Sequence, residues 1–418
     1  MTAVYLHIGS PKSGTTYIQT VLRTHRELFA EHGVLVAGDT HLDLVHAGLA
    51  VRQDARLAQL PPERRRAWTD LVAQIRAWQG RAVVVSYELF SAASAEAAQA
   101  ALRDLDGLDV HLVITARDLG RAVPSAWQER LKFGLVTSLE DWSPLPESHP
   151  RSDWGWRTLD PAGVASRWAS GLSPDKVHIV TVPRAKDAAS SDLWGRFAEA
   201  CGLGDVPVRT DVTMANESLG AVQAEVLRRL NEHVAEGLAN QRERATWLRD
   251  LVANKLLSSG TPTSGPLGAT DEQLEEATQV ARRAIAAIGD RGYRVHGDLA
   301  DLEATRPELA RTPREVEEGE VADVAVATLG QLLLWARDER GPRRPEPAPR
   351  GDRRPGRGSR RALRARIDVL EQSVEESRRL QLRVASLQDV VTELLLPAES
   401  RDDGVTNGAL RSYRRRAL

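Results

Sequence analysis

The chain has 418 residues, of which 42% are hydrophobic, and a formal net charge of -2. This length supports a full-sized globular domain and further segments, while the near-neutral charge indicates no specific nucleic-acid partner. A single cysteine, Cys201, excludes an intramolecular disulfide and any multi-cysteine zinc site, which suits a reducing compartment. The sequence shows neither a leader-like start nor an apolar run of about 18 residues. We therefore expect a cytoplasmic protein without a transmembrane segment.

The first predicted element is an apolar strand from Val4 to Ile8, followed by a glycine-rich turn and a helix. A strand ending in glycine, four further residues and then Gly14 at a helix start direct backbone N–H groups and the positive helix end at one anion. A Walker A loop carries its lysine directly after the second glycine, whereas Lys12 lies inside the turn. Only five of the 56 basic residues are lysines, which favours a functional Lys12 over a solvated one. The segment predicts a P-loop-like phosphate-binding loop outside the standard ATPase and GTPase pattern.

Strands and helices then alternate along the chain. Further buried strands are predicted at 33–36, 82–86, 110–115 and 177–182. Helices are predicted at 16–32, 62–79, 92–105, 119–133, 190–202, 216–256 and 270–289. This alternation predicts an α/β fold with a doubly wound parallel sheet, whose ligands lie at the carboxyl ends of the strands. The polar segments that follow three strands should meet there, namely Ser10 to Thr16, Ser86 to Glu88, and Arg117 with Asp118.

The C-terminal part of the chain changes in composition. Residues 329–337 are too short for a membrane span and predict a helix with one buried face. Residues 340–366 contain eleven arginines and two acids among prolines and glycines, which predicts a disordered basic linker. The whole chain is rich in arginine, so composition explains this linker more simply than nucleic-acid or membrane binding.

Apolar residues resume at spacings of three and four from Leu363 to Leu394, with one phase slip. This spacing predicts a coiled coil of about four or five heptads and hence a homo-oligomer, with a lone amphipathic helix as the alternative. The predicted domains are a sheet domain at 1–300, a helical extension at 301–339, the linker at 340–362, the coiled coil at 363–396 and a disordered tail at 397–418.

A second polar segment leaves the strand at 110–115 and enters a helix, with Arg117 at its start and Ser125 eight residues later. An arginine and a hydroxyl at one place can bind a terminal phosphate through a charged fork and a hydrogen bond. Alone, Arg117 and Asp118 could equally form a surface ion pair. Together, the two segments resemble the two nucleotide-binding signatures of the sulfotransferases that use 3′-phosphoadenylyl sulfate (PAPS). The resemblance includes the eight-residue offset and covers about residues 4–300, although only the two signatures are specific.

The resemblance implies transfer of a sulfuryl group from PAPS to a hydroxyl of a carbohydrate, glycolipid or small metabolite, without a metal. Lys12 is the expected catalytic cation, because it can offset the charge that develops on the leaving phosphate. The residues implied to bind the 5′-phosphosulfate are Ser10, Pro11, Lys12, Ser13, Gly14, Thr15 and Thr16, and those implied to bind the 3′-phosphate are Arg117 and Ser125.

One element of the cytosolic family members, an arginine-lysine-glycine motif near the end of the domain, is not visible. Asn216 to Leu219 is a loop-to-helix entry that could take its place, or Asn216 could simply cap the following helix.

The acceptor hydroxyl also needs a general base. Glu88, just past a strand end, is the first candidate and His46 is the second, because the family uses either residue type. Glu88 could instead be an acid favoured at a helix start, and His46 an ordinary surface or half-buried histidine. The acids Asp104 and Asp106 precede a strand, at the sheet edge away from the site, and are interpreted as turn residues.

A group of four tryptophans follows the second segment. These side chains could stack on sugar rings in a substrate lid or could fix a long loop to the core. They are Trp142, Trp154, Trp156 and Trp168.

Two other functions stay open. A P-loop nucleotide-binding, kinase-like enzyme would need an acid after a strand to hold magnesium, and Glu88 and Asp118 are available. A non-catalytic sulfotransferase-like scaffold would leave the role to the coiled coil, but the presence of Lys12, Arg117 and Ser125 argues against it.

Overall fold

The computed structural model describes residues 2–144, 155–184, 192–211, 218–234, 236–238, 240–258 and 265–340. The chain divides into two compact units, one of residues 1–235 and 240–333 and the other of residues 236–239 and 334–418. The sheet and the candidate site lie in the first unit. Trp154, Asn216 and residues 341–418, which include the predicted coiled coil and tail and nearly all of the linker, lie outside the described residues.

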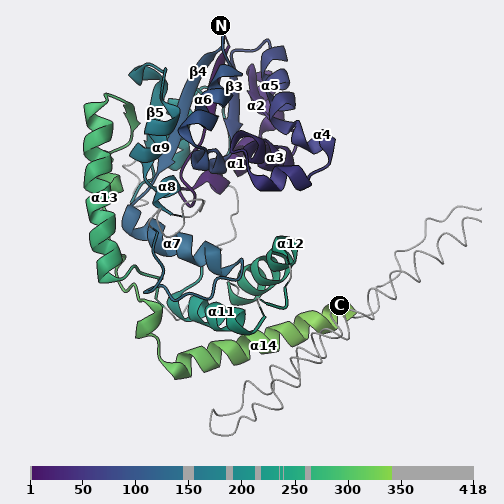
Figure 1. Ribbon diagram of the computed structural model, residues 1–418, viewed down its shortest axis with the longest axis vertical. Coiled ribbons are helices and arrows are strands. Elements are labelled where there is room, and N and C mark those ends of the chain that lie inside the picture. Colours follow the sequence, from purple (N-terminus) through teal and green to yellow (C-terminus); the bar gives the residue numbers. More distant parts are fainter. Residues whose placement is uncertain are drawn as a thin grey trace, which may run out of the picture. The chain divides into compact units, whose positions relative to one another are not determined.

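Six parallel strands form one sheet in the order β2-β3-β1-β4-β5-β6 (Figure 1). The central strands are continuous apolar runs because helices cover both of their faces, and β3 and β5 are buried at every position. The predicted α/β fold with a parallel sheet is therefore confirmed. The strands are β1 (Ala3–His7), β2 (Val34–Val36), β3 (Ala82–Ser86), β4 (Asp109–Ala116), β5 (Val177–Thr181) and β6 (Arg294–His296).

Helices pack on both faces of this sheet, as a doubly wound topology requires. One face is covered by α3, α5, α6, α9 and the end of α13, and the other by α1, α2 and α10. The helices before the fifth strand are α1 (Thr15–Thr24), α2 (Arg26–Glu31), α3 (His41–Val51), α4 (Pro62–Arg65), α5 (Ala67–Ala77), α6 (Ala95–Arg103), α7 (Leu119–Leu131), α8 (Trp156–Leu159) and α9 (Pro161–Trp168). Those after it are α10 (Leu193–Ala200), α11 (Ala221–Val234), α12 (Gln241–Arg244), α13 (Asp271–Asp290) and α14 (Glu318–Arg340).

Short helical turns complete the elements. Five are 3₁₀ turns, and η4 is a π-helical segment. They are η1 (Ala55–Gln59), η2 (Glu88–Ala92), η3 (Pro174–Lys176), η4 (Ala245–Leu257), η5 (Leu299–Leu302) and η6 (Pro313–Glu315).

A second apolar cluster joins α7, α11, η4 and α13. In Figure 1, α7 crosses the region beyond the carboxyl ends of the strands, and α11 lies on its far side. Leu119, Val123 and Trp127 of α7 are buried in this cluster. The opposite side of α7 therefore faces the carboxyl ends of the strands. The carboxyl ends of the strands therefore face a packed helical layer.

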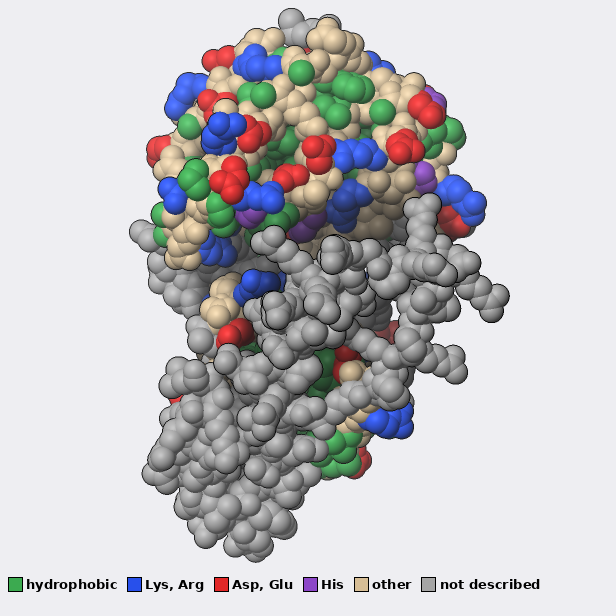
Figure 2. Space-filling model, turned by 90° about the vertical axis from the view of Figure 1, so that its right-hand side faces the viewer, with side chains coloured by type: hydrophobic (Ala, Val, Ile, Leu, Met, Phe, Trp, Pro, Cys, Tyr) green, Lys and Arg blue, Asp and Glu red, His purple; other side chains and the backbone are tan. Residues whose placement is uncertain are grey.

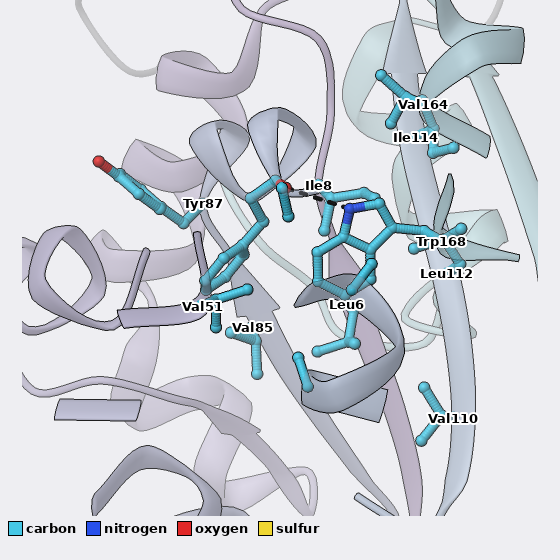
Figure 3. Packing of buried hydrophobic residues seen from close by; sticks show 14 of the residues in the cluster. Leu6, Ile8, Val51, Val85, Tyr87, Val110, Leu112, Ile114, Val164 and Trp168 are labelled. Atoms are coloured by element: carbon cyan, nitrogen blue, oxygen red, sulfur yellow. Dashed lines mark hydrogen bonds between the residues drawn. The ribbon is translucent and has the colours of Figure 1, made fainter. Parts of the chain in front are cut away.

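Three tryptophans of the group named above, those in the described part of the chain, are buried in the core. Trp168 is only 1% exposed, and its indole Nε1 donates to the backbone oxygen of Phe90 at 3.1 Å (Figure 3). Trp156 is also buried, with its Nε1 donating to a carboxylate oxygen of Glu276 at 2.6 Å, and Trp142 is buried too. Large indole surfaces are stabilised by this burial. For these three side chains, burial favours the interpretation as anchors to the core over that as a sugar-stacking lid.

The sequence-based element list differs from the structure in several places. The predicted helix at 16–32 breaks at His25 into α1 and α2, and the one at 216–256 falls into separate pieces. Helix α3 and strand β6 were not predicted. Thr40 starts α3 with a capping box, in which its hydroxyl accepts from the Asp43 N–H at 3.3 Å while the Asp43 carboxylate accepts from the Thr40 N–H at 2.8 Å.

The apolar run at 329–337 belongs to the longer helix α14. Over Glu318–Glu339 this helix is long and apolar enough, by length and composition alone, to cross a membrane, contrary to the expectation from the sequence. Upstream, residues 321–327 are small and apolar apart from Asp323 and extend this run. Leu333 and Leu334 are exposed, at 45% and 53%, so the expected buried face is at best half-buried there. Cytoplasmic localisation stays a prediction.

Candidate functional site

The loop between β1 and α1 has two residues in the left-handed backbone region. Lys12 has φ 65° and Gly14 has φ 79°. A side-chain-bearing residue in this region is uncommon and costs free energy, so its presence at a loop apex suggests a functional constraint. Gly14 is the N-cap of α1 and supplies no side-chain cap. The first amides of α1, including those of Thr15 and Thr16, therefore have no intrahelical acceptor and remain available to an anion.

A buried polar network that sequence analysis did not identify holds this loop from below. Ser13 Oγ donates to the Ser10 backbone oxygen at 2.5 Å and lies 2.7 Å from Thr115 Oγ1. His7 joins the network, with Nε2 3.1 Å from Thr115 Oγ1 and Nδ1 2.7 Å from Ser86 Oγ. Complete burial lowers the pKa of His7 to about 3, so the ring is neutral and can both donate and accept.

The glycine that ends the strand is required by this network. A Cβ on Gly9 would lie 1.9 Å from Thr115 Oγ1 and 2.8 Å from His7 Nε2. The glycine pattern seen in the sequence thus has a steric reason, because any side chain here would displace the hydrogen bonds under the loop.

The two segments that resemble nucleotide-binding signatures meet directly. The Arg117 guanidinium Nη1 donates to the backbone oxygen of Lys12 at 2.9 Å. Burial lowers the pKa of Arg117, and the Asp118 carboxylate partly offsets this. An arginine stays charged even so, because its ordinary pKa lies far above neutral pH. One guanidinium therefore fixes the loop backbone and brings a positive charge to the same place.

The Lys12 side chain reaches across to α7. Its Nζ lies 3.4 Å from Oε2 of Glu129, and the same oxygen lies 3.6 Å from Nζ of Lys132. The exposed side-chain fractions are 27% for Lys12, 14% for Glu129 and 1% for Lys132. Sequence analysis missed Glu129, although its four-residue spacing from Ser125 puts both on one side of α7.

Ser125 is half-buried on α7, one turn before Glu129. Its side of the helix is thus the one that meets the loop lysine. Asp118 has a structural role as the N-cap of α7, accepting from the Arg121 N–H at 3.3 Å and the Thr305 N–H at 3.0 Å, with the Thr305 hydroxyl as a further donor. This carboxylate is therefore engaged in closing a helix and anchoring the segment at 305.

Glu88 lies beside α1. Its Oε2 accepts from Nε2 of the buried Gln19 at 2.7 Å. Burial lowers the pKa of His41, while the Glu88 carboxylate raises it, so these two side chains share one environment. Burial also lowers the pKa of Arg23, and Glu88 again acts in the opposite direction. Glu88 is thus held about one helical turn beyond Thr15 and Thr16.

His46 has a different environment. It lies within α3 and is buried, and its Nδ1 has no hydrogen-bond partner among the described residues. Burial lowers its pKa, as does Arg64, and Asp43 raises it. The histidine that the structure brings beside Glu88 is therefore His41, five residues earlier in the chain.

The remaining loop residues are mostly buried. Ser10 is 3% exposed, and its Oγ has no hydrogen-bond partner among the described residues. Pro11 and Thr15 are buried, whereas Thr16 is exposed at the helix start. An unpaired buried hydroxyl beside free helix amides and a lysine suits an anionic ligand, because each such polar group needs a partner.

The positive character of this loop is local. On the face drawn in Figure 2, side chains of both signs are interspersed over the described surface. Among the residues that the structure describes, no three His, Cys, Asp or Glu side chains cluster as metal ligands would. Asp104, at the end of α6, accepts from the Trp68 indole at 2.8 Å, in line with its interpretation as a turn acid.

Comparison with known proteins adds limited information. Residues 363–417 match the model of a family described as a domain of unknown function, DUF6752, and the match starts where the predicted heptads start. No curated protein matches the sequence. Among solved structures, the chain is similar to the crystal structure of a sulfotransferase from Alicyclobacillus acidocaldarius, with 13% identity and a TM-score of 0.36, over 69% of this chain and 95% of that chain. At this identity and TM-score the similarity decides nothing about activity, so function must be judged from the contacts around Lys12 and Arg117.

Proposed function

We propose that the chain is a PAPS-dependent sulfotransferase that moves the sulfuryl group to an acceptor hydroxyl. The observation that carries the proposal is the 2.9 Å hydrogen bond from Arg117 to the Lys12 carbonyl. It joins two segments 105 residues apart whose sequence patterns each suit one end of a 3′,5′-bisphosphorylated nucleotide. In the proposal, the loop from Ser10 to Thr16 holds the 5′-phosphosulfate, and Arg117 with Ser125 holds the 3′-phosphate.

In the proposed reaction, the acceptor oxygen attacks sulfur in line with the bridging oxygen of the phosphosulfate. The new S–O bond forms as the old one breaks, and the leaving adenosine 3′,5′-bisphosphate takes the electron pair. Lys12 offsets the charge that builds on this leaving phosphate, together with the free amides at the start of α1. The transition state resembles that of phosphoryl transfer, in which positioning and electrostatics supply most of the catalysis.

The acceptor loses its proton to a general base. Glu88 is the proposed base, because a carboxylate held by Gln19 next to α1 stays close to the loop. His46 is the second candidate, although its charged neighbours are Arg64 and Asp43. With the described tryptophans buried in the core, the acceptor class rests on the hydroxyl chemistry alone and extends to carbohydrates, glycolipids and small metabolites.

A kinase-like reaction is the second candidate function. It would require Glu88 or Asp118 to hold magnesium, but Asp118 already caps α7 and binds Thr305. The two reactions are separated by incubating the purified chain with sulfur-labelled PAPS and with γ-phosphate-labelled ATP, each with the same panel of hydroxyl acceptors. The proposal expects label transfer from PAPS only, and transfer about 10²–10³-fold slower by the Lys12→Ala protein. Transfer of phosphate from ATP would favour the kinase-like reaction.

A further inference from the structure

The carboxylate of Glu129 lies 3.4 Å from the Lys12 ammonium, and the surroundings of Glu129 explain how it could act. Glu129 lies between two lysines, Lys12 and Lys132, whose side chains differ in solvent exposure. The side chain of Lys132 is only 1% exposed. Because Lys132 lies about one turn after Glu129 along the chain, its ammonium stays beside the Glu129 carboxylate. Lys12 is 27% exposed and belongs to a loop on the other side of the pair.

The backbone and the side chain of Lys12 are held by different partners. Arg117 fixes its carbonyl at 2.9 Å, and the left-handed φ of 65° sets the direction in which its side chain leaves the loop. The ammonium is held only by the longer contact of 3.4 Å to Glu129 among the interactions described for Lys12. The ammonium can thus exchange its partner without any movement of the loop backbone.

We infer that Glu129 is a positioning residue that keeps the Lys12 ammonium at the site before the nucleotide binds and competes with the 5′-phosphate group for it. This inference rests on the proposed function. When Lys12 turns to the phosphate, Glu129 retains Lys132 at 3.6 Å and does not become an unpaired buried charge. Because Glu129 is paired with both lysines, its carboxylate can release Lys12 at a modest free-energy cost.

The inference predicts that removal of the competing charge tightens nucleotide binding. In the Glu129→Gln protein, the dissociation constant for adenosine 3′,5′-bisphosphate should fall about fivefold, the ratio that corresponds to about 1 kcal/mol for a partly exposed ion pair. The KM for PAPS should fall with it, while kcat should not rise, because the lost contact acts on binding and not on the transition state.

The matched control is Glu320→Gln, which removes the carboxylate of a partly exposed ion pair with Arg311 at 2.7 Å and does not touch Lys12. Its dissociation constant should stay within about twofold of that of the unmodified protein, a difference of at most about 0.4 kcal/mol. If Glu129→Gln alone leaves Lys132 too poorly paired for stable folding, the Glu129→Gln, Lys132→Met double variant replaces the buried pair by neutral side chains of similar size. It should show the same tightening.

The experiment is calorimetric titration of these proteins with adenosine 3′,5′-bisphosphate, with NMR of the 13C-methylated lysines as a second readout. Five lysines give few signals, and the Lys12→Arg protein identifies the one from Lys12. Glu129→Gln should shift that signal even without nucleotide. Equal or weaker nucleotide binding by Glu129→Gln, or equal tightening by Glu320→Gln, would overturn the role of Glu129 alone. If the unmodified protein does not bind the bisphosphate, the proposed function fails as well, whereas the lysine spectrum still reports whether the Lys12–Glu129 pair exists.

Discussion

Replacement of Gly14 by alanine tests the link between loop geometry and anion binding. Gly14 has φ 79°, a region in which an L-residue with a Cβ costs about 1–2 kcal/mol. The added Cβ would also lie 2.3 Å from Cδ2 of Leu193, so that side chain at the start of α10 must move, at a further cost on the order of 1 kcal/mol. We expect the free energy of unfolding to fall by about 2–3 kcal/mol in total.

The matched control is Gly107→Ala. Gly107 has φ 83°, but an added Cβ would meet no atom within 4 Å, and the residue lies in the turn before β4, at the opposite edge of the sheet. This variant should therefore lose only the backbone contribution of about 1–2 kcal/mol. Urea denaturation of both variants measures the two losses, and calorimetry measures adenosine 3′,5′-bisphosphate binding below the transition.

The two variants should differ most in binding. Gly14→Ala is expected to weaken bisphosphate binding at least about tenfold, corresponding to 1.4 kcal/mol, because the amides of α1 are displaced from the anion. Gly107→Ala should bind like the unmodified protein. Unchanged binding by a folded Gly14→Ala protein would refute the assignment of this loop as the anion site.

Three further predictions concern single side chains. Lys12→Ala should lower sulfuryl transfer by about 10²–10³-fold with an unchanged circular dichroism spectrum, since one well-placed donor stabilises the transition state by about 2.7–4 kcal/mol; full activity would remove Lys12 from the mechanism. Glu88→Gln should lower kcat by about 10²–10⁴-fold and His46→Gln should not, and the opposite ranking in steady-state kinetics would identify His46 as the base. Because burial lowers the pKa of His7 from 6.5 to about 3, only the unfolded chain takes up its proton between these values. The stability that neutral His7 provides is complete above pH 6.5 and is lost as the pH falls towards 3, by about 2 kcal/mol from pH 7 to pH 5. Urea denaturation at both pH values should show that the His7→Gln protein loses less stability between pH 7 and pH 5 than the unmodified protein. An equal loss in the two proteins would contradict the buried, neutral state of His7.

The central fold was predictable because its strands are uninterrupted apolar runs. The run Ala82–Ser86 has no polar residue before its end, and only a strand covered on both faces suits such a run. In contrast, β6 has three residues, of which Arg294 and His296 are polar, so its apolar signal is a single valine. Its membership of the sheet depends on pairing with β5, which no local pattern encodes.

Local motifs predicted the loop, whereas contacts across the chain decided the rest of the site. The network under the loop could have been suspected from polar residues at the ends of three predicted neighbouring strands, since His7 pairs in register with Ser86. Thr115 lies on the third strand, and its contact with Ser13 spans 102 residues. The same holds for Glu129, which meets Lys12 across 117 residues and stands on α7 without any local motif.

The tryptophans and the candidate histidine show the limits of residue type as a guide. The tryptophans were compatible with stacking on a sugar, but the burial of Trp142, Trp156 and Trp168 depends on which helices pack over them. His46 was singled out as the second candidate base by its residue type. The α3 helix, started by Thr40, instead turns His41 towards Glu88, and the capping pattern of Thr40 with Asp43 was the signal that could have revealed this helix.

The central claim, that this site binds a 3′,5′-bisphosphorylated adenosine nucleotide, is tested most directly by calorimetry. Purified protein is titrated with adenosine 3′,5′-bisphosphate, with ADP and with AMP, and the titrations are repeated with the Arg117→Ala protein. We expect the bisphosphate to bind at least about tenfold more tightly than ADP or AMP, and Arg117→Ala to lose that preference. Equal affinity for the three nucleotides, or a preference that survives in Arg117→Ala, would contradict the claim.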